Sequence, residues 1–267
     1  MPDWLDLREG DLPLIVSIPH AGTEVPDECA SRFLADVDYL KDTDWHIDRL
    51  YAPIVPAGAT WIRTAISRSV IDANRPADRQ SLYPGQATTD LCPVTDFDGM
   101  PLYATENEPD RNEIERRIEL YHRPYHAAIE GQIARLRKMH GAVVLLDCHS
   151  IRPRVPRLFE GTLPAINLGT NGGLSCAPAV SDALSDLVEA SPFSWVINGR
   201  FRGGWITRNF GRPANNVHAV QIEIAMNTYL SVDSDEGYGR PDYDIGVACL
   251  LQNTLRKIVA RLSIPNL

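Results

Sequence analysis

The sequence is poor in cysteine: its five cysteines stand far apart, at positions 29, 92, 148, 176 and 249, and none belongs to a CxxC pair. This spacing excludes a zinc site built on clustered thiolates. An odd number of cysteines would also leave one thiol unpaired in a secreted, disulfide-bonded protein. We therefore expect a protein of the reducing cytoplasm.

Long apolar runs are also absent. The first residues, MPDWLDLREGDLPLIV, have neither the basic start nor the apolar stretch of a signal peptide. No uncharged apolar run approaches the ~20 residues that a transmembrane helix needs. We expect no membrane association.

Basic residues are outnumbered, with 26 Lys and Arg against 35 Asp and Glu and a net charge of −9. A broad basic face for nucleic acid is therefore not expected, and the expected partner is a small molecule. With 267 residues, 44% of them hydrophobic, the chain can form one sizeable core. We predict a single domain over 1–267, and no pattern specifies an oligomeric state.

Apolar, β-branched runs alternate with amphipathic helical patterns along the chain. Over 110–140, apolar residues recur close to the 3.6-residue period, and Pro124 is expected to kink or split this helix. The alternation predicts an α/β layer fold with a mainly parallel sheet. The predicted strands are 13–21, 60–66, 142–149, 193–201 and 217–225, and the predicted helices are 110–140, 178–190 and 242–262.

Residues 76–109 are different, because they are rich in Pro, Gly, Thr and Asp and show no clear period. A stretch of this length without secondary structure is usually functional in a compact domain. We interpret it as a loop that covers or borders the functional site.

Polar residues suited to catalysis stand in three predicted strands. His20 and His149 end the first and the third strand, and Glu223 lies in a late one. In open α/β sheets, ligands gather at the carboxyl ends of the strands. Histidines and a carboxylate that leave one position open for water are typical ligands of catalytic zinc. The sequence therefore predicts one zinc ion here, with another divalent metal or a structural role for each histidine as alternatives.

The carboxylate ligand is open between three residues. Asp44 stands at an expected helix start and can point out of the first turn, and Asp48 lies one turn further on. Glu24 comes four residues after His20, but a neighbouring glycine and proline disfavour a regular helix there. We favour Asp44, with Glu24 as the alternative.

Two further pairs surround these candidates. Asp147 and His149 alternate onto one face of their strand, so Asp147 is expected to orient His149 while Cys148 points into the core. His122 and His126 have the four-residue spacing of a helical metal pair, but a proline between them disturbs that geometry. For His126 we expect a contact with substrate or support of a ligand.

Arginines cluster at two places. Arg68 and Arg75 follow the second predicted strand, and Arg200, Arg202 and Arg208 stand within nine residues around a diglycine. Such clusters in an acidic protein favour a carboxylate-binding pocket, because the guanidinium fork matches a carboxylate. Surface ion pairs are the alternative for any single arginine.

Several strings resemble the N-formylglutamate amidohydrolase family over about residues 12–230: PHAGT, DTDWHID, SRSVIDANRP, RPYH, LDCHSI, NGRFRGGWITRNFGRP and HAVQIEI, in this order. The resemblance implies a three-layer fold similar to zinc carboxypeptidases, with a mixed, mainly parallel sheet flanked by helices. Relatives of that fold bind zinc through His-x-x-Glu, but Thr23 replaces the glutamate here, which moves our choice to Asp44. The residues on matching features are His20, Asn74, Arg75, His149 and Glu223.

The resemblance also implies an activity, the zinc-dependent hydrolysis of N-formyl-L-glutamate to formate and L-glutamate, the last step of one histidine-degradation route. In this interpretation Glu223 is the general base and Arg68 stabilises the oxyanion. The expected substrate-binding residues are Asn74, Arg75, His126, Arg202 and Arg208. The alternatives are an amidohydrolase for another N-acyl acidic amino acid and a non-catalytic protein that binds an acidic metabolite.

Overall fold

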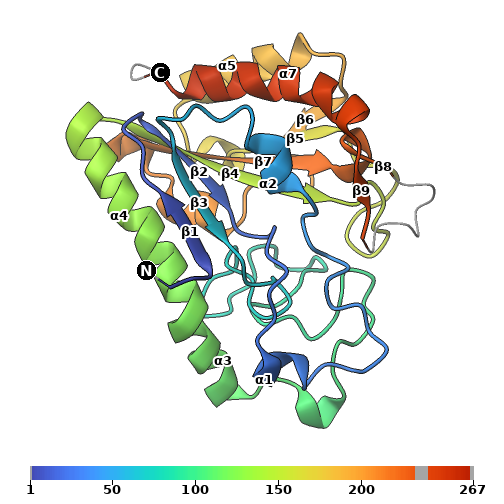
Figure 1. Cartoon of the computed structure of the whole chain (residues 1–267). Coiled ribbons are helices and arrows are strands. Elements are labelled where there is room, and N and C mark those ends of the chain that lie inside the picture. Colours follow the sequence, from blue (N-terminus) through green and yellow to red (C-terminus); the bar gives the residue numbers. More distant parts are fainter. Residues whose placement is uncertain (1, 232–239, 265–267) are drawn as a thin grey trace.

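A mixed β-sheet of seven strands organises the residues that the computed structural model describes, 2–231 and 240–264 (Figure 1). Its strands lie in the order β1-β3-β2-β4-β7-β5-β6. Their bounds are β1 Leu5–Arg8, β2 Leu14–Ile18, β3 Thr60–Thr64, β4 Val143–Ile151, β5 Ile166–Gly169, β6 Trp195–Ile197 and β7 Val217–Ala225.

The centre of the sheet is parallel: β2 pairs with β3 and β4, and β4 pairs with β7. β1 is antiparallel to β3, and β5 is antiparallel to β7. The predicted α/β fold with a mixed, mainly parallel sheet is therefore confirmed. β1 and β5, of four residues each, were not predicted. The predicted strand 193–201 is shorter in the structure, because Asn198 adopts a left-handed φ of 52° and ends the pairing after Ile197.

Helices cover both faces of the sheet, since alternate side chains of each strand point to opposite sides. Leu14, Val16 and Ile18 pack with α2, α5 and α7, while Ile15 packs with α4 and α6. Each such buried side chain contributes ~1.5–3 kcal/mol. The helices are α1 Asp27–Ala30, α2 Ile47–Tyr51, α3 Arg111–Arg117, α4 Arg123–His140, α5 Pro178–Glu189, α6 Trp205–Phe210 and α7 Ile245–Leu262.

Short elements connect these layers. A two-stranded ribbon joins β8 Leu230–Ser231 and β9 Asp242–Tyr243. The 3-10 turns are η1 Thr105–Asn107, η3 Asn171–Gly173, η4 Pro213–Asn215 and η5 Met226–Thr228. No helix of the described residues is long and apolar enough to cross a membrane.

The predicted helix 110–140 is split, as Pro124 led us to expect. A π-helical turn, η2 Ile118–His122, separates α3 from α4 just before this proline. Asp110 caps the start of α3 by accepting the amide of Glu113 at 2.8 Å, and Gly141 ends α4 in a left-handed conformation.

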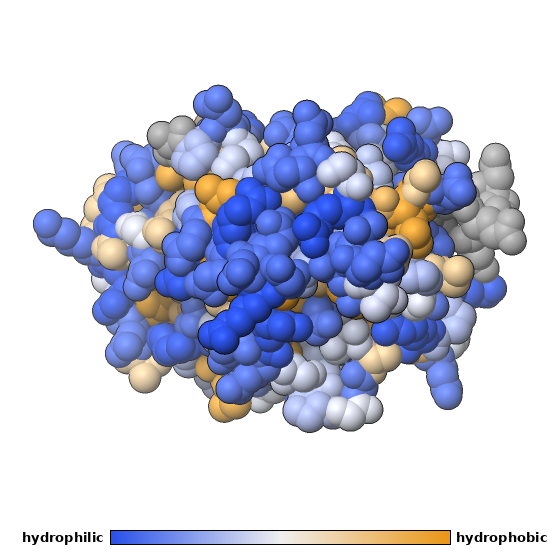
Figure 2. Space-filling model, turned by 90° about the horizontal axis from the view of Figure 1, so that it is seen from below, coloured by the Kyte–Doolittle hydropathy of each residue, from blue (hydrophilic) through white to orange (hydrophobic). Residues whose placement is uncertain are grey.

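Residues 76–109 form no helix or strand except η1 and isolated bridges. They run below the sheet in the view of Figure 1, where their teal trace lies above α1. The surface on this side of the molecule is mainly hydrophilic (Figure 2). The segment therefore faces solvent beside the sheet, where a functional site can form.

Candidate active site

The fold brings His20, His149 and Glu223 together towards the carboxyl ends of the central strands. His20 follows β2, and His149 and Glu223 are register partners on the adjacent strands β4 and β7. The three residues are only 2%, 2% and 6% exposed, respectively. The parallel centre of the sheet thus gathers side chains that are far apart in the sequence.

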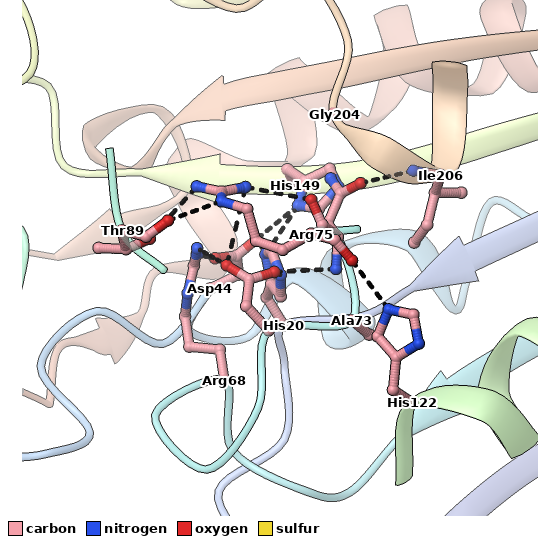
Figure 3. Close-up of polar contacts among 12 residues, drawn as sticks. His20, Asp44, Arg68, Ala73, Arg75, Thr89, His122, His149, Gly204 and Ile206 are labelled. Atoms are coloured by element: carbon pink, nitrogen blue, oxygen red, sulfur yellow. Dashed lines mark hydrogen bonds and ion pairs between the residues drawn. The ribbon is translucent and has the colours of Figure 1, made fainter. Parts of the chain in front are cut away.

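Asp44 joins the two histidines. Its amide donates to the His20 carbonyl at 3.0 Å, which fixes the backbone. Its Oδ2 lies 3.2 Å from His149 Nδ1 and 3.7 Å from His20 Nδ1, and the two Nδ1 atoms are 3.1 Å apart (Figure 3). The other two candidate ligands lie elsewhere: Glu24 is exposed, and Asp48 pairs with Arg63.

The second nitrogen of each ring meets another carboxylate. His20 Nε2 lies 2.7 Å from Asp72 Oδ1, and His149 Nε2 lies 2.9 Å from Asp147 Oδ2. An ionised carboxylate only accepts hydrogen bonds, so each Nε2 carries a proton, and Nδ1 is the nitrogen of each ring that faces the cluster. Asp147 contacts His149 as expected, whereas the contact between His20 and Asp72 was not predicted.

The donor set formed by His20, Asp44 and His149 fits a zinc ion. With tetrahedral ligands at about 2.0–2.1 Å from zinc, neighbouring ligand atoms are about 3.3 Å apart. The three observed separations, 3.1, 3.2 and 3.7 Å, surround this value. Burial alone would lower the pKa of His149, but Asp147 and Asp44 raise it well above its usual range. The cluster therefore favours a positive charge at its centre.

Arg68 is held beside this cluster by two carboxylates. Its NH1 is 3.3 Å from Asp44 Oδ1, and its NH2 is 2.8 Å from Asp72 Oδ2. The guanidinium also lies 4.7 Å from the centre of the Phe97 ring. Arg68 is therefore a fixed cation between the carboxylates that contact the two histidines.

Glu223 is a buried carboxyl group whose register partner on β4 is His149. Its Oε2 accepts a hydrogen bond of 2.8 Å from Gln221. Burial raises the pKa of Glu223 to about 8, although the charge of His149 opposes this shift. A carboxyl group with a pKa near neutrality can both accept and donate a proton, as a general base and acid must.

A pocket opens over these residues. Segment 76–109 borders it, as predicted, through Tyr83, Thr88, Thr89 and Phe97. Asp44 lies behind the wall, 1% exposed. The lining includes six of the predicted site residues: His20, Arg68, Asn74, Arg75, His149 and Glu223.

Two arginines place positive charge on the pocket wall. Arg75 donates from Nε to the Thr89 carbonyl at 2.9 Å, and its NH1 lies 3.8 Å from Asp72. Arg200 donates to the carbonyls of Leu158 and Ala87, at 2.7 and 2.9 Å. Within the described part of the chain Arg200 forms no ion pair with a carboxylate, and burial and the charge of Arg75 lower its pKa. An anion bound between the two would be stabilised by both.

The structure places Arg202, Arg208 and His126 outside the pocket lining. Arg202 is exposed, and Arg208 donates to the carbonyls of Gly203 and Leu82 at 2.8 and 2.9 Å. His126 lies 2.8 Å from a backbone carbonyl instead. The spacing of these arginines in the sequence did not distinguish them from Arg200, because the backbone of this loop sets the direction in which each side chain points.

The diglycine of the same loop serves the packing of the protein itself. Gly203 has a φ of 109°, which favours glycine, and a Cβ on Gly204 would lie 2.3 Å from Asn74 Nδ2. The amide of Asn74 is used at both ends: Oδ1 accepts from the Ile206 amide at 2.8 Å, and Nδ2 donates to Asp147 at 3.3 Å. Asn74 therefore ties α6 to the carboxylate that contacts His149.

The chain is similar in sequence and fold to known proteins. The N-formylglutamate deformylases of Pseudomonas putida and Pseudomonas aeruginosa are 42% and 41% identical over 261 residues, 97% of this chain and of each relative. A crystal structure of an N-formylglutamate amidohydrolase from Ralstonia eutropha matches with a TM-score of 0.79 at 25% identity, covering 97% of this chain and 96% of that one. The family profile described as N-formylglutamate amidohydrolase matches residues 12–230. The chain is therefore a hydrolase of an amide bond and belongs to the N-formylglutamate amidohydrolase family.

Proposed function

We propose that this enzyme hydrolyses N-formyl-L-glutamate to formate and L-glutamate with one zinc ion, as the last step of a histidine-degradation route in the cytoplasm. The observation that carries the proposal is the convergence of His20 Nδ1, His149 Nδ1 and Asp44 Oδ2 beside Glu223. The activity named for the Pseudomonas relatives supports the substrate. Free cysteines at all five positions agree with a reducing compartment.

His20, Asp44 and His149 would hold the zinc ion, with Asp72 and Asp147 keeping both rings in the required tautomer. When bound, zinc supplies Lewis-acid polarisation of the formyl carbonyl and acidifies water. Glu223 takes a proton from the attacking water and then gives a proton to the nitrogen of the departing amine. Burial raises the pKa of Glu223 to about 8, which makes its carboxylate a stronger base for the first of these two transfers.

Arg68 is our candidate for stabilising the oxyanion. It lines the pocket with Glu223, and its ion pairs with Asp44 and Asp72 hold the guanidinium in place without a change of conformation. A preorganised cation costs no reorganisation when negative charge develops on the formyl oxygen. Loss of one such donor typically raises the barrier by ~2.7–4 kcal/mol.

Arg75 and Arg200 are our candidates for the two carboxylates of the substrate. Both line the pocket, and both are held by backbone carbonyls, which leave their positive charge without full compensation. We assign Asn74 to positioning, because its amide is already used at both ends. Arg200 thus takes the role that the sequence suggested for Arg202 or Arg208.

The test of the activity is formate release from N-formyl-L-glutamate, with N-formylaspartate and N-acetylglutamate measured beside it. We expect the first substrate to be preferred, a chelator to abolish release and zinc to restore it. A preference for N-acetylglutamate would favour an amidohydrolase for another acyl group. Binding of all three compounds without turnover, at full zinc occupancy, would favour a non-catalytic binding protein.

Replacing Arg200 by glutamine is expected to raise KM for N-formyl-L-glutamate roughly 10- to 100-fold with little change in kcat, because a charge-assisted contact is lost. Arg212→Gln is the matched control, since Arg212 also donates to backbone carbonyls but does not line the pocket. The measurement is steady-state kinetics on the dicarboxylate and on formylglycine, which lacks the second carboxylate. An equal loss on both substrates would contradict recognition of the second carboxylate by Arg200.

A further inference from the structure

Two histidines at the junction of η2 and α4 are not used by the reaction described above. The rings of His122 and His126 stack, with centroids 4.1 Å apart and an interplanar angle of 20°. Neither residue lines the pocket. Each ring instead reaches the backbone of residues 72–75, as His122 does in Figure 3: His122 Nε2 lies 2.8 Å from the Arg75 carbonyl, and His126 Nε2 lies 2.8 Å from the Ala73 carbonyl.

Both rings act as neutral hydrogen-bond donors. A carbonyl oxygen only accepts, so each Nε2 carries a proton. Burial lowers the pKa of His122, and burial with the neighbouring His122 lowers that of His126 to about 3. The two stacked rings therefore donate through Nε2 without a charge that would repel the other ring.

Three residues of the segment that they hold, Asp72, Asn74 and Arg75, contact or line the candidate site. Asp72 accepts from His20 at 2.7 Å and from Arg68 at 2.8 Å. The Asn74 side chain ties Asp147 to α6, and its backbone N–H donates to Asp72 Oδ1 at 2.8 Å. Arg75 places a guanidinium on the pocket wall. Residues 72–75 belong to no helix or strand, so their backbone depends on two turn bonds to Asp72 and on contacts from outside the segment.

The π-helical turn explains how both rings reach this segment. Pro124 has no amide hydrogen to continue the regular ladder, and Arg123 donates to the Ile118 carbonyl across five residues. His122, the last residue of the turn, and His126 then present stacked rings, and Phe210 of α6 stacks on His126 with centroids 5.6 Å apart. π-Helical turns are rare and are frequent at functional sites.

We propose that His122 and His126 are positioning residues for the reaction, each setting one part of residues 72–75 through its bond to a backbone carbonyl. His126 holds the carbonyl between Asp72 and Asn74, and so sets the carboxylate that orients His20. His122 holds the carbonyl of Arg75, and so sets the guanidinium that faces the substrate. The kinetic part of this inference rests on the proposed hydrolysis of N-formyl-L-glutamate, whereas its zinc-release part rests only on the proposed zinc site.

The two roles predict different losses. In His126→Asn the amide ends short of the former Nε2, so we expect kcat to fall roughly 10- to 100-fold and zinc to dissociate faster by a similar factor, as for other residues that support metal ligands. In His122→Asn we expect KM to rise roughly tenfold with zinc release near that of the wild type. His126→Gln and His122→Gln place an amide nitrogen near the former Nε2 and are expected to restore most of each loss.

The experiment measures kcat and KM for N-formyl-L-glutamate, the rate of zinc transfer to a chromogenic chelator, and Tm for each variant. His140→Asn is the matched control. His140 lies in α4, as His126 does, and its Nε2 lies 2.6 Å from the Asp11 carbonyl, away from the pocket. We expect this control to keep the kinetic constants and the zinc release of the wild type. If an asparagine variant does not fold, His126→Phe replaces it, since phenylalanine keeps the stacking with Phe210 and donates no hydrogen bond.

Three results would overturn the proposal: unchanged kinetics and zinc release in both asparagine variants, equal behaviour of the asparagine and glutamine variants, or the same losses in His140→Asn. A purely structural role would lower Tm without the split between kcat and KM. If wild-type protein loaded with zinc does not hydrolyse the substrate, the proposed function fails. The zinc-release rates of the His126 variants then still decide whether His126 positions the zinc site.

Discussion

The Glu223→Gln variant is expected to lose about 10²–10⁴-fold in kcat for formate release, the usual contribution of a general acid–base. Glutamine has nearly the same shape, and its amide can still contact Gln221, but it cannot take a proton from water. Zinc content and the affinity for N-formyl-L-glutamate should remain close to those of the wild type. Steady-state kinetics, metal analysis and equilibrium binding of the uncleaved substrate check these three expectations.

Glu24→Gln is the control for this substitution, because Glu24 is an exposed glutamate in the loop that follows His20. It should keep wild-type turnover and zinc content. Near-normal turnover in Glu223→Gln would remove Glu223 from the mechanism. A loss of turnover that matches a loss of zinc would show that Glu223 acts on metal binding instead of proton transfer.

Glu223→Gln should also change how the stability of the metal-free protein depends on pH. Burial raises the pKa of Glu223 from 4.5 to about 8 in the folded state. The wild type therefore loses stability as the pH rises from about 4.5 to about 8, because over this range the unfolded chain releases the Glu223 proton while the folded protein retains it. Glutamine does not ionise, so the Tm of the variant should fall less than that of the wild type between about pH 5 and pH 8. Thermal unfolding scans of both zinc-free proteins at each pH measure this difference. An equal loss in both proteins would mean that Glu223 is not held neutral by burial.

The second large effect is expected for Asp44→Asn. Loss of the anionic ligand between the two histidines should weaken zinc binding by at least about 100-fold, more than the loss of a residue that only supports a ligand. Formate release should fall by a similar factor at limiting zinc. Arg68 also loses one of its two carboxylate partners, so part of the loss should persist when zinc is in excess. Zinc titration against a competing chelator, with activity measured at each free zinc concentration, separates the two effects.

Asp48→Asn is the matched control, because it is the same substitution four residues further on, in α2. Asp48 pairs with Arg63 at 3.0 Å in a partly exposed ion pair, whose loss should cost at most ~1 kcal/mol of stability and no activity. Zinc loss in Asp48→Asn with retention in Asp44→Asn would reverse the assignment of the carboxylate ligand.

The sequence located the strands that carry the chemistry more reliably than the rest of the fold. Strand 217–225 has the same bounds as predicted, the predicted strand 13–21 contains β2, and the predicted strand 142–149 overlaps β4, which continues to Ile151. These strands are buried along their whole length and are mainly apolar, although Asp147 and His149 lie within β4 and Glu223 lies within β7. β5 has only four residues, and such a short run cannot be distinguished from a loop by its period.

By itself, the sequence determined the fold class, the family resemblance, and the candidate residues His20, His149 and Glu223, because buried strands and local motifs are properties of neighbouring residues. Only the tertiary structure brought Asp44, and not Glu24 or Asp48, beside the two histidines, and only it joined Asp72 to His20 across 52 residues. It also decided that Arg200, and not Arg202 or Arg208, lines the pocket. The physical reason is that these choices depend on where loop side chains point, and long-range packing and hydrogen bonds to distant carbonyls set that direction.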